Sequence, residues 1–170
     1  IKTQEVEFTP DSESADIILI NTCGFIDAAK EESINTILEA VSLKEKSNKK
    51  VIVTGCLVER YKEELEKEIP EVDEFIDLKN QNQIPLKLGI QIKSENKRVI
   101  STPKHLAYLK ISEGCDHTCS FCAIPNIRGK HRSKPIEDLV EEAKYLADLG
   151  VKELNIVSQD TSYYGTDIYG

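Results

Sequence analysis

Residues 106–122 read LAYLKISEGCDHTCSFC, and this stretch decides the fold of the second half of the chain. The first six residues, 106–111, are mostly apolar and have the length of a β-strand. Three cysteines follow within eight residues: Cys115, Cys119 and Cys122. The sequence therefore predicts a strand that carries a thiol-rich loop at its carboxyl end.

A helix and a second strand are predicted after this loop. Pro135 suits the first turn of a helix, Ser133 is a candidate cap, and Gly150 ends the apolar periodicity. Residues 151–157 then form another strand pattern. Strand, loop, helix and strand in this order open a parallel barrel or a doubly wound sheet, in which ligands bind at the carboxyl ends of the strands.

The first half of the chain also alternates strand and helix patterns. Strands are predicted at 16–20 and 51–54, with a less regular third one at 72–78. A helix begins at Asp27 after the first strand, and a charged helix at 59–68 follows the second. Strands joined by such short helices usually pair in parallel, so we expect an α/β fold.

The domain organisation follows from where the pattern is lost. Residues 79–105 are polar or broken by proline and glycine, which predicts a linker with at most one short extended segment. We therefore expect an incomplete N-terminal parallel-sheet domain at 1–78 and the first part of a barrel domain at 106–170. Because the chain contains no methionine and starts with Ile1, we interpret it as an internal piece of a longer protein.

Composition narrows the classes of function. The 170 residues carry a formal net charge of -8, and no apolar run is long enough to cross a membrane. An acidic chain is a poor general nucleic-acid binder, and residues 128–134 are a local basic exception. Five cysteines are an odd number for a disulfide framework, so they indicate metal chemistry in a reducing compartment such as the cytoplasm.

The three thiols of residues 115–122 favour an iron–sulfur cluster. Thiolates are the usual ligands of such clusters, and three of them hold three corners of a cube while the fourth iron stays open to substrate. The alternative is a structural zinc ion, which needs four ligands. His117 lies inside the loop, and His105 and His131 flank it, so a non-catalytic zinc-binding module is the competing interpretation.

Two further cysteines and three polar residues are weaker candidates. Cys23 and Cys56 each follow a predicted strand, so parallel pairing brings them to one end of a sheet, although spacing alone favours two small buried cysteines. Arg128 opens the basic run and either lines the cavity or is simply solvated. Gln159 and Asp160 end the second barrel strand, where they either meet a ligand or form a turn.

The cysteine loop resembles the signature of radical S-adenosylmethionine enzymes, C-x3-C-x-aromatic-C, with Phe121 as the aromatic residue. The residues around it, Glu113-Gly114-Cys115 and Ile127-Arg128-Gly129, are similar to the methylthiotransferase branch. The N-terminal motifs Asn21-Thr22-Cys23-Gly24-Phe25 and Thr54-Gly55-Cys56 match the N-terminal domain of that branch. The resemblance implies a methylthiotransferase domain followed by the start of a TIM-like (β/α) barrel.

The resemblance also implies cofactors. Cys115, Cys119 and Cys122 would bind a [4Fe–4S] cluster whose open iron chelates S-adenosylmethionine, with Phe121, Arg128, Gln159 and Asp160 near that cofactor. Cys23 and Cys56 would bind a second [4Fe–4S] cluster whose third ligand lies upstream of residue 1. The chemistry implied is hydrogen abstraction by a radical, which suits an unactivated C–H bond.

Two segments indicate which substrate the enzyme would modify. Residues 26–33 and 158–162 resemble the subfamily that methylthiolates an aspartate of the twelfth protein of the small ribosomal subunit. A tRNA adenosine methylthiotransferase is the nearest alternative. The partners implied are that ribosomal protein and an electron donor such as flavodoxin or ferredoxin, and we expect this piece alone to be inactive in the full reaction.

Overall fold

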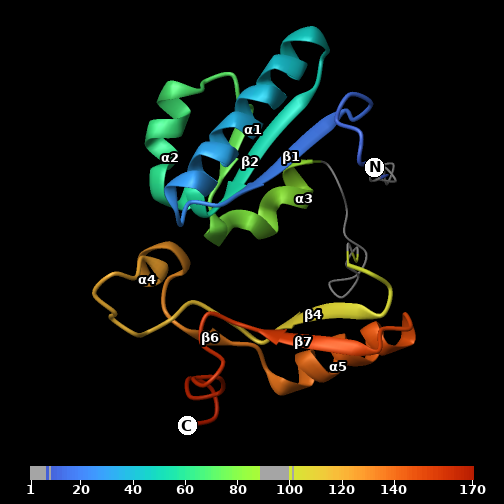
Figure 1. Ribbon diagram of the computed structural model, residues 1–170, viewed down its shortest axis with the longest axis vertical. Coiled ribbons are helices and arrows are strands. Elements are labelled where there is room, and N and C mark those ends of the chain that lie inside the picture. Colours follow the sequence, from blue (N-terminus) through green and yellow to red (C-terminus); the bar gives the residue numbers. More distant parts are fainter. Residues whose placement is uncertain (1–6, 8, 89–99, 101) are drawn as a thin grey trace. The chain divides into compact units, whose positions relative to one another are not determined.

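The computed structural model describes residues 7, 9–88, 100 and 102–170. The chain divides into two compact units, Ile1–Ile92 and Lys93–Gly170, which are described separately (Figure 1). Both are mixed α/β units built on parallel strand pairs, so the predicted α/β class is confirmed. No described helix has the length and apolarity needed to cross a membrane.

The first unit is a three-stranded parallel sheet in the order β1-β2-β3. Its strands are β1 (Ile17–Thr22), β2 (Lys50–Gly55) and β3 (Glu74–Ile76). Helices α1 (Asp27–Lys46) and α2 (Cys56–Glu68) connect them. All three predicted strands and both helices are present, and α2 begins at Cys56 rather than at residue 59.

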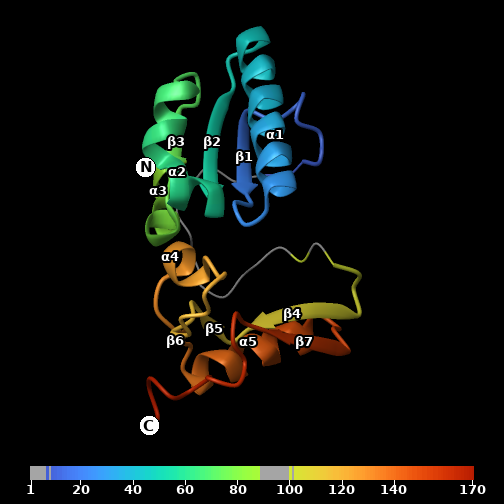
Figure 2. The same ribbon diagram turned by 60° about the vertical axis from the view of Figure 1, so that its left-hand side comes forward.

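Both helices cover the same face of this sheet. Val51 and Val53 of β2 are fully buried there, and α1 contributes Ile37 while α2 contributes Val58 to the same core. The opposite face is covered only in part, because Ile17 and Leu19 of β1 stay exposed. The helices thus fix the strands so that the carboxyl ends of β1 and β2 lie side by side (Figure 2).

The start of the predicted linker is helical. A 3-10 helix, η1 (Leu78–Gln83), leads into a short helix, α3 (Ile84–Lys87). The Asp77 side chain caps η1 by accepting the Asn80 backbone N–H at 2.9 Å. Aspartate is a common helix-capping residue, so Asp77 was a sequence signal for the start of a helix. The polar composition of the segment led to its interpretation as a linker instead. Residues 89–99 and 101 of the predicted linker, where a short extended segment was one possibility, lie outside the described part.

The second unit is a strand–helix–strand motif with a long insertion. Its parallel strands are β4 (Leu106–Lys110) and β7 (Glu153–Val157), joined by α5 (Ile136–Asp148). The insertion contains β5 (Ser112–Glu113), α4 (Ile124–Arg128) and β6 (Arg132–Ser133). Ala107 of β4 packs with Leu146 of α5 in the core.

The start of α5 differs from the sequence-based expectation. The helix begins at Ile136 with Pro135 as its cap residue, and no side chain caps it. Ser133 does not cap the helix, because its Oγ accepts the Gly165 N–H at 2.9 Å and lies 3.0 Å from His131 Nε2. This serine therefore ties β6 to the C-terminal loop.

Candidate metal centres

The cysteine loop leaves the sheet at the carboxyl end of β4. Its base is closed by the antiparallel pair β5–β6, in which Ser112 pairs with Ser133 and Glu113 with Arg132. The Ile111 N–H donates to the Val157 carbonyl at 3.1 Å, which joins the base of the loop to the end of β7. The predicted position of the loop, at the carboxyl end of a parallel pair, is therefore observed.

The first residues of the loop are held by backbone and side-chain hydrogen bonds. The Gly114 N–H donates to Gln159 Oε1 at 2.9 Å, and the Cys115 N–H donates to the Gly129 carbonyl at 3.1 Å. Gly114 has a φ of 79°, and a Cβ there would lie 2.1 Å from the Lys130 carbonyl oxygen. Only glycine fits this position, because any side chain would collide with backbone.

His117 links the loop to the segment after β7. Its Nε2 lies 2.7 Å from Asp160 Oδ2, while Asp160 Oδ1 accepts both the N–H and the hydroxyl of Ser162. The hydrogen bonds from Ser162 and His117 hold the pKa of Asp160 below its ordinary value, although burial opposes them. Gln159 and Asp160, predicted near the cofactor, thus both contact the cysteine loop.

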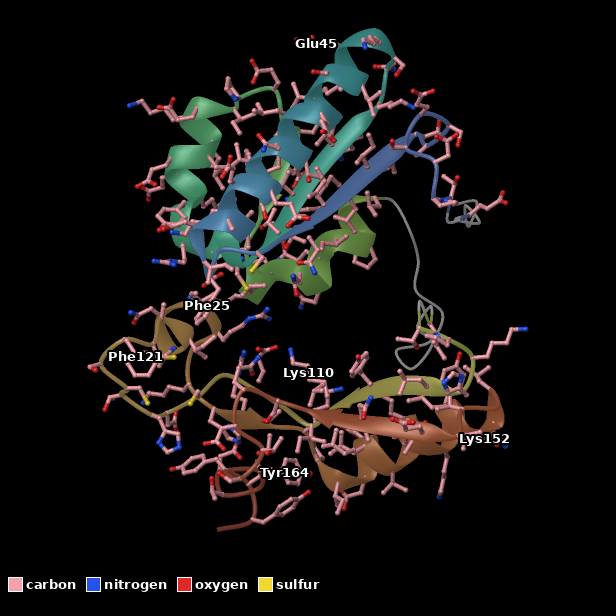
Figure 3. The ribbon with its side chains drawn as sticks, viewed as in Figure 1. Phe25, Glu45, Lys110, Phe121, Lys152 and Tyr164 are labelled. Carbon is pink, nitrogen blue, oxygen red and sulfur yellow. The ribbon has the colours of Figure 1, made fainter. Side chains whose placement is uncertain are left out.

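The second half of the loop is exposed. Cys119 is exposed, and the Phe121 ring is 92% exposed (Figure 3). The Cys122 N–H donates to the Cys119 carbonyl at 3.1 Å, which closes a turn just before α4. All five cysteines are free thiols, and within the described residues no three metal-ligating side chains are gathered into a ready-made site. The donor set fits a thiolate-bound metal, and the loop must adjust to hold it.

The histidines that would complete a zinc site are placed unevenly. His105 lies just before β4, at the opposite end of that strand from the cysteine loop, and its carbonyl accepts the Lys152 N–H at 2.8 Å. The ring of His131 is buried, lies 3.0 Å from the Ser133 hydroxyl and meets the edge of Tyr163. Of the three histidines, only His117 lies inside the cysteine loop.

Arg128 lies at the end of α4, close to the base of the loop. Its Nη1 is 3.5 Å from Glu113 Oε1, and the other carboxylate oxygen of Glu113 pairs with Lys110. Lys110 is labelled on β4 in Figure 3. The predicted basic residue is therefore half-buried beside a carboxylate rather than simply solvated.

The second predicted thiol pair lies at adjacent strand ends. Thr22 pairs with Gly55 in the β1–β2 register, and Cys23 and Cys56 come directly after them. Gly55 has a φ of 108°, and a Cβ on it would lie 2.3 Å from the Thr22 carbonyl oxygen. The two cysteine-bearing turns therefore approach each other through backbone, as the parallel pairing predicted.

Two residues that the sequence did not single out hold these turns. Ser33 Oγ on α1 accepts the Cys23 N–H and donates to the Cys23 carbonyl, both at 3.1 Å. Arg60 Nη1 on α2 donates to the Gly24 carbonyl at 2.8 Å. Nothing in the sequence pattern indicated that Ser33 and Arg60 hold these turns, because their partners are backbone atoms that lie far away in the sequence.

Two family models match the chain. Residues 1–77 match the model described as uncharacterized protein family UPF0004, and residues 109–169 match the radical SAM superfamily. The chain therefore carries a UPF0004 region followed by a radical SAM region. The resemblance drawn from the cysteine loop and the N-terminal motifs is confirmed.

The curated relatives are more specific. They are named ribosomal protein uS12 methylthiotransferase RimO. The chain is 78% identical over 170 residues to that of a Sulfurihydrogenibium species, and the match covers 100% of this chain and 40% of the relative. Identity to the Aquifex aeolicus protein is 60% over 169 residues, covering 99% and 38% of the two chains. The chain thus spans about 40% of the length of the curated relatives it matches.

A solved structure shares the fold. It is a radical S-adenosylmethionine methyltransferase, TsrM, from Kitasatospora setae, with a TM-score of 0.56 and 11% identity. The match covers 86% of this chain and 37% of that one. At this identity, the likeness concerns the fold alone.

Proposed function

We propose that this protein is a radical S-adenosylmethionine methylthiotransferase that modifies the β-carbon of an aspartate in ribosomal protein uS12. One observation carries the proposal: three free thiols, spaced C-x3-C-x2-C, stand in a loop at the carboxyl end of the β4–β7 pair. Ligands of parallel α/β folds bind at that end of the strands. The names of the relatives at 78% and 60% identity support the substrate.

Cys115, Cys119 and Cys122 would hold a [4Fe–4S] cluster and leave its fourth iron open for S-adenosylmethionine. When bound, this pair of cofactors supplies one-electron chemistry that removes hydrogen from an unactivated C–H bond. The protein contributes position and exclusion of water. The exposed turn from Cys119 to Cys122 would move onto the cluster, while Cys115 is already held by the Gly129 carbonyl.

Cys23 and Cys56 would hold a second [4Fe–4S] cluster that delivers sulfur. Two thiols at adjoining strand ends provide two of the three ligands, and the third would come from upstream of Cys23. The backbone contact at Gly55 supports this role, since it brings the two turns close without any side chain between them.

The remaining predicted residues would surround the cofactor. We assign Phe121 to cover the cluster, because a ring that is 92% exposed gains most from a partner that binds beside it. Arg128, half-buried beside Glu113, would meet the cofactor carboxylate or the substrate. Gln159 and Asp160 already bond to the cysteine loop, so we assign their contribution to the shape of that loop.

The partners follow from the reaction. The aspartate-bearing ribosomal protein is the substrate, and flavodoxin or ferredoxin supplies the electron. The place of action is the cytoplasm, where free thiols persist. The net charge of -8 argues against direct nucleic-acid binding by this part of the protein.

Anaerobic reconstitution with iron and sulfide tests the two clusters. The full-length protein, which would supply the third upstream ligand, should become brown and bind about twice as much iron as its Cys23→Ala variant. Cys119→Ala should lose S-adenosylmethionine cleavage, whereas Cys23→Ala should keep cleavage and lose methylthiolation. Stoichiometric zinc without colour would overturn the proposal in favour of a zinc-binding module.

The substrate is tested in a deletion strain. Mass spectrometry should find ribosomal protein uS12 without its methylthio group and tRNA nucleosides unchanged. A loss confined to tRNA hydrolysates would replace the protein substrate by a tRNA adenosine.

A further inference from the structure

We propose that Gln159 and Asp160 are positioning residues that clasp the first half of the cysteine loop and set the geometry in which Cys115 meets the cluster. This inference rests on the proposed function, because it assigns the loop to a [4Fe–4S] cluster. It concerns residues of this chain that do not themselves ligate iron.

The clasp holds the loop on both sides of Cys115. Before it, the Gly114 N–H donates to Gln159 Oε1 at 2.9 Å. After it, His117 Nε2 lies 2.7 Å from Asp160 Oδ2. Two neighbouring residues after β7 thus fix the residues on either side of the first thiol, and the peptide of Cys115 has little freedom left.

Asp160 is well suited to hold an imidazole. Its side chain is only 14% exposed, and its second oxygen is fixed by the N–H and hydroxyl of Ser162 at 3.0 and 2.7 Å. The Tyr163 ring meets the edge of His117 with the centroids 5.7 Å apart. Asp160 is therefore fixed before it bonds to His117, and a preorganised acceptor loses little entropy on bonding.

The clasp ends at His117, whose side chain is itself 59% exposed. Thr118, Cys119, Ser120 and Phe121 are all exposed. Cys115 is therefore held in place before metal binding, whereas Cys119 and Cys122 would move when the metal binds. Because β7 pairs with β4, the clasp also keeps Cys115 in register with the strand ends at which the cofactor binds.

Amide hydrogen exchange of the metal-free protein tests the clasp without any cofactor. Asp160→Ala and His117→Ala should each speed exchange at residues 114–117 by about 3- to 10-fold, the loss expected for one hydrogen bond. The double variant should exchange no faster than either single variant. Asp160→Asn keeps one carbonyl oxygen, which can accept from His117 or from Ser162 but not from both, so exchange should fall between that of Asp160→Ala and that of wild type.

Asp167→Ala is the matched control. Asp167 is another carboxylate of the C-terminal loop, and its Oδ2 accepts the Ser133 N–H at 2.8 Å, at β6 and not within residues 114–117. Exchange at residues 114–117 should stay at the wild-type rate. Unchanged exchange in Asp160→Ala, or additive effects in the double variant, would overturn the clasp.

A second readout follows reconstitution. Asp160→Ala should shift the electron paramagnetic resonance signal and the midpoint potential of the reduced cluster, and Asp167→Ala should leave both unchanged. Identical spectra in Asp160→Ala and wild type would overturn the positioning role. A wild-type protein that binds no iron would overturn the proposed function instead, and the exchange data would still decide whether the clasp exists.

Discussion

The two cysteine-bearing regions are held in different ways. The turns with Cys23 and Cys56 lie in direct backbone contact, because Gly55 lies against Thr22 and both turns follow paired strands, and side chains of α1 and α2 add hydrogen bonds to them. The cysteine loop of residues 115–122 is held at its start, by the Gly129 carbonyl and by side chains that arrive from the end of β7. Its second half is exposed.

This difference separates two ways to build a metal centre. Backbone contact makes a stiff site in which a single Cβ is intolerable, so its geometry is set when the sheet forms. Side-chain contact makes a site whose position can be tuned by one substitution while the fold persists. The predictions below test this contrast, from the largest expected effect to the smallest.

Gly55→Ala should destabilise the first unit by at least about 3 kcal/mol, through positive-φ strain and collision with the Thr22 carbonyl. Gly129→Ala is the control in the other region, because Gly129 has a φ of 75° and open space around the added Cβ. It shares the strained backbone region of Gly55 but not the collision, so it should cost about 1–3 kcal/mol and less than Gly55→Ala. Urea denaturation measures both, and equal losses would contradict the backbone-contact account.

Ser33→Ala should cost about 1–2 kcal/mol, because the Cys23 peptide loses both hydrogen bonds to a side chain that is 8% exposed. Thr36→Ala on the same helix is the control, since the Thr36 hydroxyl bonds only to the exposed Glu32 carbonyl. It should change the unfolding free energy by less than about 0.5 kcal/mol. If the Ser33 variant were as stable as the Thr36 variant, the hydrogen bonds between Ser33 and the Cys23 backbone would not contribute to the stability of the first unit.

Acid should weaken the first unit through Asp73. Burial raises the pKa of this carboxyl, but the hydrogen bonds from Lys44 and the Val51 N–H outweigh it and hold the pKa below its ordinary value. A lowered folded pKa means that the stabilisation is complete above about pH 4 and is lost as the pH falls through the folded pKa. Asp73→Asn should show a smaller loss of unfolding free energy between about pH 6 and pH 3. Parallel pH curves for the two proteins would refute this role.

Phe121→Ala should change the stability of the metal-free protein by less than about 0.5 kcal/mol, because the ring is exposed. Ile127→Ala in the neighbouring α4 should cost about 2–4 kcal/mol, since that side chain is buried. Thermal unfolding compares the two. A large loss at Phe121 would mean that the second half of the loop is packed rather than open.

The sequence predicted the strands and helices whose apolar spacing is regular. Strand β2 is a short run of buried aliphatic residues, and the turns after β1 and β2 carry the cysteines as expected. The sequence placed Gln159 and Asp160 after the second barrel strand, and in the structure both bond to the cysteine loop, while their place near a cofactor stays a prediction.

The short elements could not be predicted, because no local periodicity defines them. The pair β5–β6 has two residues in each strand, and its pairing joins segments that the cysteine loop separates. The bond between His117 and Asp160 spans 43 residues of sequence, so only the pairing of β7 with β4 makes it possible. The role of Ser33 was missed for a different reason. Its partners are backbone atoms of Cys23, and no sequence pattern marks such a contact.

The long sequence separation between His117 and Asp160 has a consequence for biosynthesis. At 5–20 residues per second, the ribosome needs about 2–9 s to add the 43 residues that separate them. During that interval the nascent thiols have no tether from the segment after β7. The first half of the loop is therefore free to move during that interval, and translation of the Gln159–Asp160 segment supplies the contacts that hold it.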